Sequence, residues 1–202
     1  MKKGFTLIEM LVVLGIVAVL VAAGLGAYSG ATRAAERKRC QELVSNTATA
    51  LTALFQAKGA WPRALREKGS TDGKLDADTA FPLAKGGYMS LTTSGNRLSG
   101  LDRFGIVSPW ATAHIKRRGS SAQLSDKIGL GTLGEDHTLH FALDLDGDGV
   151  IKGASVGGES VDIRATAAVW CCGKDGKLEP YSRGLKKDDV YSWAHGQTQN
   201  VK

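Results

Sequence analysis

A long apolar run near the N-terminus constrains this chain more than any other feature of its sequence. From Phe5 to Tyr28 the only ionisable groups are Glu9 and the phenol of Tyr28. As a helix, these residues extend roughly 36 Å, which is enough to cross a bilayer core of about 30 Å. The run therefore predicts one transmembrane helix, with the rest of the 202-residue chain outside the bilayer.

This run differs from a cleaved signal peptide and from an ordinary membrane anchor. It is longer than a typical signal-peptide core, has no small-residue cleavage site and continues into further helix. Glu9 interrupts its apolar character, and a carboxylate within lipid is so costly that we expect it to have a partner. The segment therefore predicts more than simple anchoring.

Residues Lys3 to Glu9 (KGFTLIE) resemble the N-terminal signal of type IV prepilins and of type II secretion pseudopilins. The resemblance implies that a membrane prepilin peptidase cuts after Gly4 and methylates the new N-terminal amine of Phe5. It also implies that Glu9 pairs with the N-terminal amine of a neighbouring subunit during filament assembly. This pairing is physically reasonable, because a desolvated ammonium and a desolvated carboxylate compensate each other.

The rest of the chain predicts an α+β fold in which one long N-terminal helix, from Phe5 to Lys58, packs on a small antiparallel sheet. After Tyr28, apolar residues recur at helical spacing, and Gly59 and Pro62 are suited to end the helix. The recurring positions are Cys40, Leu43, Val44, Thr47, Ala50, Leu51, Leu54 and Phe55.

Residues 63–101 predict loop with short elements, and a C-terminal loop region is expected to close the chain. Runs at 105–107, 114–116, 138–143 and 161–170 predict the strands of a sheet with one apolar face toward the helix. The expected organisation is a leader at 1–4, a transmembrane and filament-core helix at 5–28, an amphipathic helix at 29–60 and a globular domain at 61–202.

The charge pattern and the polar motifs argue against nucleic-acid binding and against catalysis. The 26 basic residues exceed the 20 acidic ones, a net charge of +6, but they are scattered apart from a cluster at 33–39. A GxGxxG match at 129–134 precedes an acidic turn rather than a helix, so it is no dinucleotide site. His137 and His140 would point to opposite faces of a strand, which argues against a two-histidine metal site.

An acidic loop gives the strongest signal for a bound ion. Asp144, Asp146 and Asp148, with Gly149 at the sixth place and Val150 at the seventh, reproduce the first half of an EF-hand loop and predict a calcium site. The twelfth place is Ser155, which cannot supply a bidentate carboxylate, so Glu159 or Asp162 is expected to reach back instead. The alternative is an acidic turn without an ion, because Asp-Gly pairs favour turns.

A second resemblance covers the C-terminal end. Residues 169–177 (VWCCGKDGK) and 188–193 (DDVYSW) resemble the closing segment of pseudopilin-like proteins. In the major pseudopilin of type II secretion a C-terminal loop binds calcium. This resemblance implies that Asp175, Asp188 and Asp189 are rival calcium ligands, and the alternative for them is a solvated polar loop.

The three cysteines leave two arrangements open. A bond between the adjacent Cys171 and Cys172 would be strained, so pairing of either one with Cys40 is the favoured disulfide in an exported domain. The alternative is three reduced, buried thiols, because free cysteine packs as a small hydrophobic residue.

These features together predict a structural protein and not an enzyme. The two resemblances favour a subunit of a type II secretion pseudopilus that supports protein export. It would be anchored in the inner membrane with its C-terminal domain in the periplasm, contact an assembly platform, and then polymerise with other pilin-like subunits. The alternatives are a subunit of an extended type IV pilus, which would serve adhesion, motility or DNA uptake, and a membrane-tethered binding domain.

Overall fold

The structure, a computed structural model, divides the chain into two units, Met1–Glu36 and Arg37–Lys202. The residues it describes are 7–100, 102, 105–111, 137–174, 176–178, 180–181, 189–193 and 198–200, with the side chains of 23–29 and 198–200 excepted.

Helix α1, Leu7–Lys58, makes up the described part of the first unit and continues into the second, which confirms the predicted long helix. It ends where Gly59 adopts a positive φ of 67° and donates its N–H to the carbonyl of Phe55 at 2.8 Å. A non-glycine residue is strained in that conformation, and the following Pro62 opens the next helix.

The second unit contains further short helices and nine short strands among its described residues. The four-stranded sheet runs β1-β4-β7-β8, the three-stranded sheet runs β5-β6-β9, and β2-β3 is a separate hairpin; all pairs are antiparallel. The elements are α2 (Arg63–Lys68), β1 (Gly73–Lys74), α3 (Ala77–Lys85), β2 (Thr93–Ser94), β3 (Arg97–Leu98), β4 (His140–Leu143), β5 (Ile151–Val156), β6 (Glu159–Ile163), β7 (Ala167–Cys171), β8 (Val190–Tyr191) and β9 (Thr198–Asn200).

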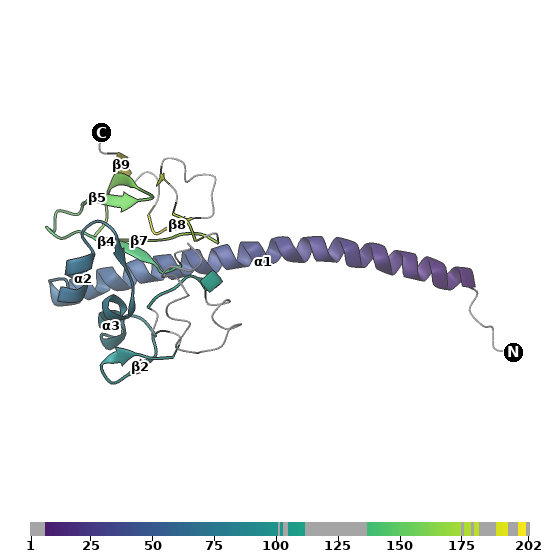
Figure 1. The fold of residues 1–202 in the computed structure, drawn as a ribbon, viewed down its shortest axis with the longest axis horizontal. Helices are drawn as coiled ribbons and strands as arrows, with labels where there is room; N and C mark the ends of the chain where they lie inside the picture. Colours follow the sequence, from purple (N-terminus) through teal and green to yellow (C-terminus); the bar gives the residue numbers. More distant parts are fainter. Residues whose placement is uncertain are drawn as a thin grey trace. The chain divides into compact units, whose positions relative to one another are not determined.

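The four-stranded sheet is buried on both faces because α1 packs on one face and strands β5 and β6 pack on the other. The side chains of Phe141 and Val169, which pair across β4 and β7, belong to the core that contains the helix residues Cys40, Val44, Leu51 and Leu54. The alternate residues Ala142 and Trp170 belong to a second core with β5 and β6. Figure 1 shows β4 and β7 beside the C-terminal part of α1.

The buried face of α1 is the one that the apolar spacing predicts. The described residues with the least exposure in this part of the helix are Cys40, Val44, Thr47, Ala50, Leu51 and Leu54, each at most 6% exposed. Leu43 and Phe55 pack against the same core from partly buried positions. The predicted amphipathic helix is therefore confirmed from Arg37 to Lys58.

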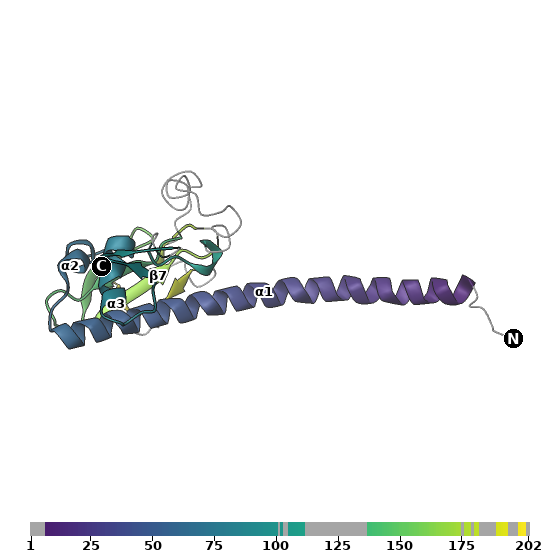
Figure 2. The same cartoon turned by 90° about the horizontal axis from the view of Figure 1, so that it is seen from below.

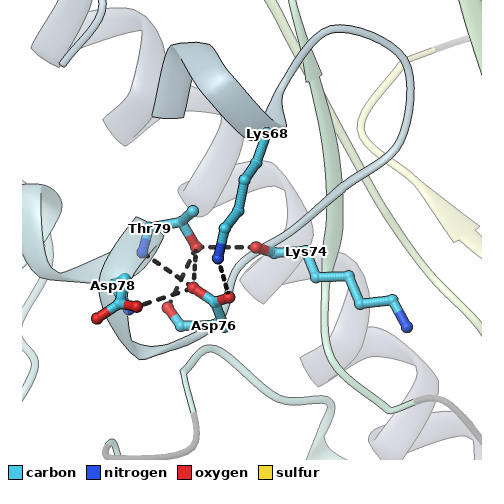
Figure 3. A network of polar contacts seen from close by, with 5 residues as sticks. All are labelled: Lys68, Lys74, Asp76, Asp78 and Thr79. Carbon is cyan, nitrogen blue, oxygen red and sulfur yellow. Dashed lines mark hydrogen bonds and ion pairs between the residues drawn. The ribbon is translucent and has the colours of Figure 1, made fainter. Parts of the chain in front are cut away.

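The prediction of loop with short elements for residues 63–101 left the type of those elements open, and two of them are the short helices α2 and α3. Both helices lie beside the C-terminal part of α1 in two perpendicular views (Figures 1 and 2). Asp76 starts α3 by accepting hydrogen bonds on Oδ1 from the N–H groups of Asp78 and Thr79, at 3.2 and 3.1 Å (Figure 3). Such capping satisfies backbone donors that a helix start leaves without partners.

The strand predictions are correct in part. Residues 140–143 and 167–171 form β4 and β7, but the run at 161–170 is divided between β6 and β7. Val107 forms only an isolated bridge with Thr138, and 114–116 lies outside the described residues. The four-stranded sheet turns an apolar face toward α1, as expected, and its other face is apolar as well because strands β5 and β6 cover it.

Candidate functional sites

The N-terminal part of α1 presents a continuous apolar surface with one carboxylate. Twelve large apolar side chains between Leu7 and Val21 are 49–86% exposed, and Glu9 lies among them in the first turn of the helix. The predicted cleavage and methylation residues, Gly4 and Phe5, lie outside the described residues. An apolar surface of this extent is typical of a segment that is covered by lipid or by another protein.

One result bears on the predicted membrane helix. Among the helical residues that the structure describes, no stretch combines the length and the apolar character needed to cross a membrane.

The acidic loop between β4 and β5 brings its three predicted carboxylates together. Oxygen atoms of Asp144, Asp146 and Asp148 lie within 4.8 Å of one another. Asp144 is buried, and its two oxygens accept the N–H groups of Gly147 at 2.7 Å and Gly149 at 2.8 Å. These bonds fold the loop around one carboxylate, and Gly147 and Gly149 allow it through φ values of 78° and 84°.

Lys152 occupies the open side of this acidic loop, and the sequence analysis did not single it out. Its ammonium contacts Asp146 at 2.7 Å and Asp148 at 2.5 Å. The hydrogen bond from the Lys152 ammonium lowers the pKa of Asp146 to about 2. Both carboxylates raise the pKa of Lys152 above its ordinary range. In this structure the exposed carboxylates of Asp146 and Asp148 are therefore already paired with one positive charge, the ammonium of Lys152.

The further ligands proposed for this loop are not gathered around it. Asp162 lies across from β5 and accepts the N–H of Gly153 at 2.7 Å. Glu159 pairs with Val156 at the far end of the β5-β6 hairpin, whereas Ile163 pairs with Ile151 at the loop end. The four-residue separation of Glu159 from Ile163 corresponds to about 13 Å along the strand. Val150 directly precedes β5, at the loop end of that strand. Its main-chain carbonyl is therefore a nearer candidate than Glu159 for a further calcium ligand.

The rival C-terminal loop is described in part. Asp175 and Asp188 lie outside the described residues. Asp189 is buried, and its Oδ1 accepts the N–H of Gly173 at 3.0 Å. Burial and this carboxylate together raise the pKa of Tyr191, whose hydroxyl lies 3.4 Å from Asp189 Oδ2. The described part of this loop therefore uses Asp189 in hydrogen bonds within the domain.

None of the three cysteines forms a disulfide in the structure, and all three are buried. Cys40 on α1 and Cys171 on β7 are in side-chain contact, which with burial raises the pKa of Cys171 well above its ordinary range. Cys172 Sγ lies 3.9 Å from Nε2 of His140, whose Nδ1 lies 2.6 Å from Asp72 Oδ1. This Cys-His-Asp group was missed because its members are far apart in sequence.

Comparisons with known proteins match the N-terminal segment and a larger part of the chain. Residues 1–25 match the prokaryotic N-terminal methylation motif. The chain is 30% identical over 129 residues to type IV major pilin protein PilE1 of Neisseria gonorrhoeae, covering 63% of this chain and 50% of that protein. It is 36% identical over 63 residues to type IV major pilin protein PilE of the same organism, covering 31% of this chain and 38% of that protein.

The chain spans half the length of one of these curated relatives and less of the other. No solved structure matches the chain. The N-terminal segment therefore carries the prokaryotic N-terminal methylation motif, as the resemblance at residues 3–9 implied. Over part of its length the chain is similar to type IV major pilins, and its long N-terminal helix with antiparallel sheets is consistent with that similarity.

Proposed function

We propose that the protein is a structural subunit of a type IV pilus-like filament and has no enzymatic role. The observation that carries the proposal is Glu9 on the exposed apolar surface of α1, within the methylation motif at residues 1–25. Burial of one large apolar side chain contributes about 1.5–3 kcal/mol, so twelve of them supply ample free energy for association. Two successive environments, the membrane and then the filament core, would cover this surface.

The precursor is anchored in the inner membrane through residues 5–28, with its C-terminal domain in the periplasm. This part of the proposal rests on the apolar composition of the segment. A prepilin peptidase then removes residues 1–4 and methylates Phe5, and an inner-membrane platform guides the subunit into the filament. Intact-mass analysis of membrane-extracted protein should give a chain that begins at N-methylated Phe5. A mature N-terminus between Ala22 and Gly30 would instead identify an ordinary signal peptide.

We propose that Glu9 stabilises the filament by pairing with the N-terminal amine of a neighbouring subunit. Glu9→Leu should leave membrane insertion unchanged and strongly reduce incorporation into filaments, because the amine of the neighbour would lose its carboxylate partner within an apolar core. Met10→Leu, at the next position on the same exposed surface, is the matched control and should assemble normally. Normal filaments from Glu9→Leu would contradict the pairing.

Among filaments, we favour a type II secretion pseudopilus because of the C-terminal resemblance. The extended type IV pilus is the second candidate, and the similarity to two type IV major pilins supports it. A strain lacking the protein separates the two: loss of an exported protein from the medium identifies a pseudopilus. Loss of surface filaments with unchanged export identifies a pilus.

We also propose that the acidic loop binds calcium through Asp144, Asp146, Asp148 and the carbonyl of Val150. Hard carboxylate oxygens that already lie within 4.8 Å of one another suit this ion, and water would complete its six to eight ligands. The ammonium of Lys152 occupies the exposed side of the cluster, so calcium would have to displace it.

Thermal unfolding with and without calcium tests this site. A ligand that binds only the folded state at a hundredfold excess over Kd stabilises it by about 2.7 kcal/mol. Asp146→Ala should abolish the shift if this loop holds the ion, whereas Asp189→Ala should abolish it if the C-terminal loop does. Lys152→Met should strengthen calcium binding, because it removes the competing cation. An unchanged melting temperature at millimolar calcium would show that the loop is only a turn.

A further inference from the structure

Two of the three buried cysteines, Cys40 and Cys171, lie where α1 packs on the four-stranded sheet. Cys40 and Cys171 are fully buried members of one core cluster, together with Val44 and Val169. Cys40 lies on the face of α1 that packs on the sheet. Cys171 is the last residue of β7, a central strand of that sheet.

Strand geometry decides which of the two adjacent cysteines faces the helix. Successive side chains of a strand point to opposite faces of the sheet. Val169 and Cys171 belong to the core shared with α1, whereas Trp170 between them belongs to the core shared with β5 and β6. Cys172 therefore follows Trp170 to the face away from α1.

The neighbours of Cys172 agree with this assignment. Its Sγ lies 3.9 Å from His140 Nε2, and the His140 ring stacks on Trp170 with centroids 5.8 Å apart. His140 pairs with Trp170 across β4 and β7, and Asp72 holds its other ring nitrogen at 2.6 Å. Cys172 is thus engaged on the far face of the sheet and is turned away from Cys40.

We propose that Cys40 and Cys171 form a disulfide that joins helix α1 to strand β7, and that Cys172 stays a thiol beside His140. The two thiols lose two protons and two electrons, the Sγ–Sγ bond forms, and a protein or small-molecule disulfide is reduced to two thiols. Export to an oxidising compartment, as in the proposed function, supplies such an oxidant. Because both sulfurs are fully buried, the exchange occurs during folding, before the core closes.

The cross-link joins residues far apart in the chain, so its effect on stability should be large. Closing a loop of more than a hundred residues restricts the unfolded chain more than closing a short one. Reduction should therefore lower the melting temperature of the wild-type protein by roughly 10 °C. Cys172→Ser should show the same response to reduction, whereas Cys171→Ser should melt at one temperature with or without reductant.

The test is to refold the full chain in detergent with glutathione disulfide, denature it without reductant and alkylate the free thiols. One thiol of three should react, and trypsin should release residues 40–58 linked to residues 165–174. Cys172→Ser should keep this linked pair, and Cys171→Ser and Cys40→Ser should lose it.

Two results would overturn the proposal. In the first, all three thiols of the wild-type chain are alkylated; in the second, the linked pair persists in Cys171→Ser and is lost in Cys172→Ser. The wild-type measurement needs no variant, so a variant that fails to fold leaves the proposal testable. The oxidation is carried out on purified protein, so its failure is distinct from a failure of filament assembly, which the Glu9 variant reports.

Discussion

Replacing Gly105 by alanine should destabilise the globular domain through a backbone collision. Gly105 has a φ of 87°, and a Cβ built on it would lie 2.6 Å from the Cα of Asp76 and closer still to the carbonyl oxygen of Leu75. That same oxygen accepts the N–H of Ile106 at 2.8 Å. The new methyl group would therefore push apart two buried segments that are joined by a hydrogen bond.

The expected cost has separable parts, and Gly100 provides the matched control. Gly100 also has a positive φ, 62°, but a Cβ there would meet nothing within 4 Å. Gly100→Ala should cost only the conformational strain of about 1–2 kcal/mol. Gly105→Ala adds about 1–3 kcal/mol of overpacking and about 1 kcal/mol for the weakened hydrogen bond. The difference between the two variants should be about 2–4 kcal/mol.

Thermal unfolding of the detergent-solubilised chain, followed by near-ultraviolet circular dichroism, measures this difference. For a chain of this size, 1 kcal/mol shifts the melting temperature by roughly 2–4 °C. Gly105→Ala should thus melt at least about 4 °C below Gly100→Ala. Equal melting temperatures for the two variants would refute the argument, because backbone strain would then account for the whole effect.

Two further predictions concern polar contacts of the same domain. Asp76→Ala should destabilise it by about 1 kcal/mol in urea unfolding, because α3 loses its N-cap; Asp76→Asn, which keeps an acceptor, should cost less. Lys152 holds the pKa of Asp146 at about 2, below its ordinary 3.8, so this pair stabilises the fold above about pH 4 and loses that effect as the pH falls toward 2. Without calcium, Asp146→Asn should flatten the decline in melting temperature between pH 4 and 2, and a decline as steep as in the wild type would contradict the assignment.

The sequence was most informative where one periodic pattern extends over many residues. The helical spacing from Cys40 to Leu54 identified the buried face of α1, because a long amphipathic helix repeats the same signal in every turn. Helices α2 and α3 have six and nine residues, and α3 contains Pro82. Such short elements depend on caps and on tertiary contacts, which periodicity does not detect.

The candidate sites were likewise predictable where their residues are neighbours in sequence, and not where the fold brings distant residues together. The three aspartates of the acidic loop were found because they are neighbours in sequence, and the structure brings their oxygens together. The contact of His140 with Asp72 joins residues 68 positions apart, so no spacing rule could predict it. The alternation that turns Cys171 toward α1 and Cys172 away required knowing where β7 lies in the sheet.

The indole of Trp61 connects the end of α1 to the four-stranded sheet, so a pulling force on α1 would be transmitted through it. Trp61 lies three residues after the end of α1, stacks on Phe55 and donates Nε1–H to the carbonyl of Asp144 at 2.7 Å. A slip of α1 by one residue, about 1.5 Å along its axis, would break this hydrogen bond. Because Asp144 directly follows β4, tension on the helix would be passed to a central strand of the sheet and to the first residue of the acidic loop.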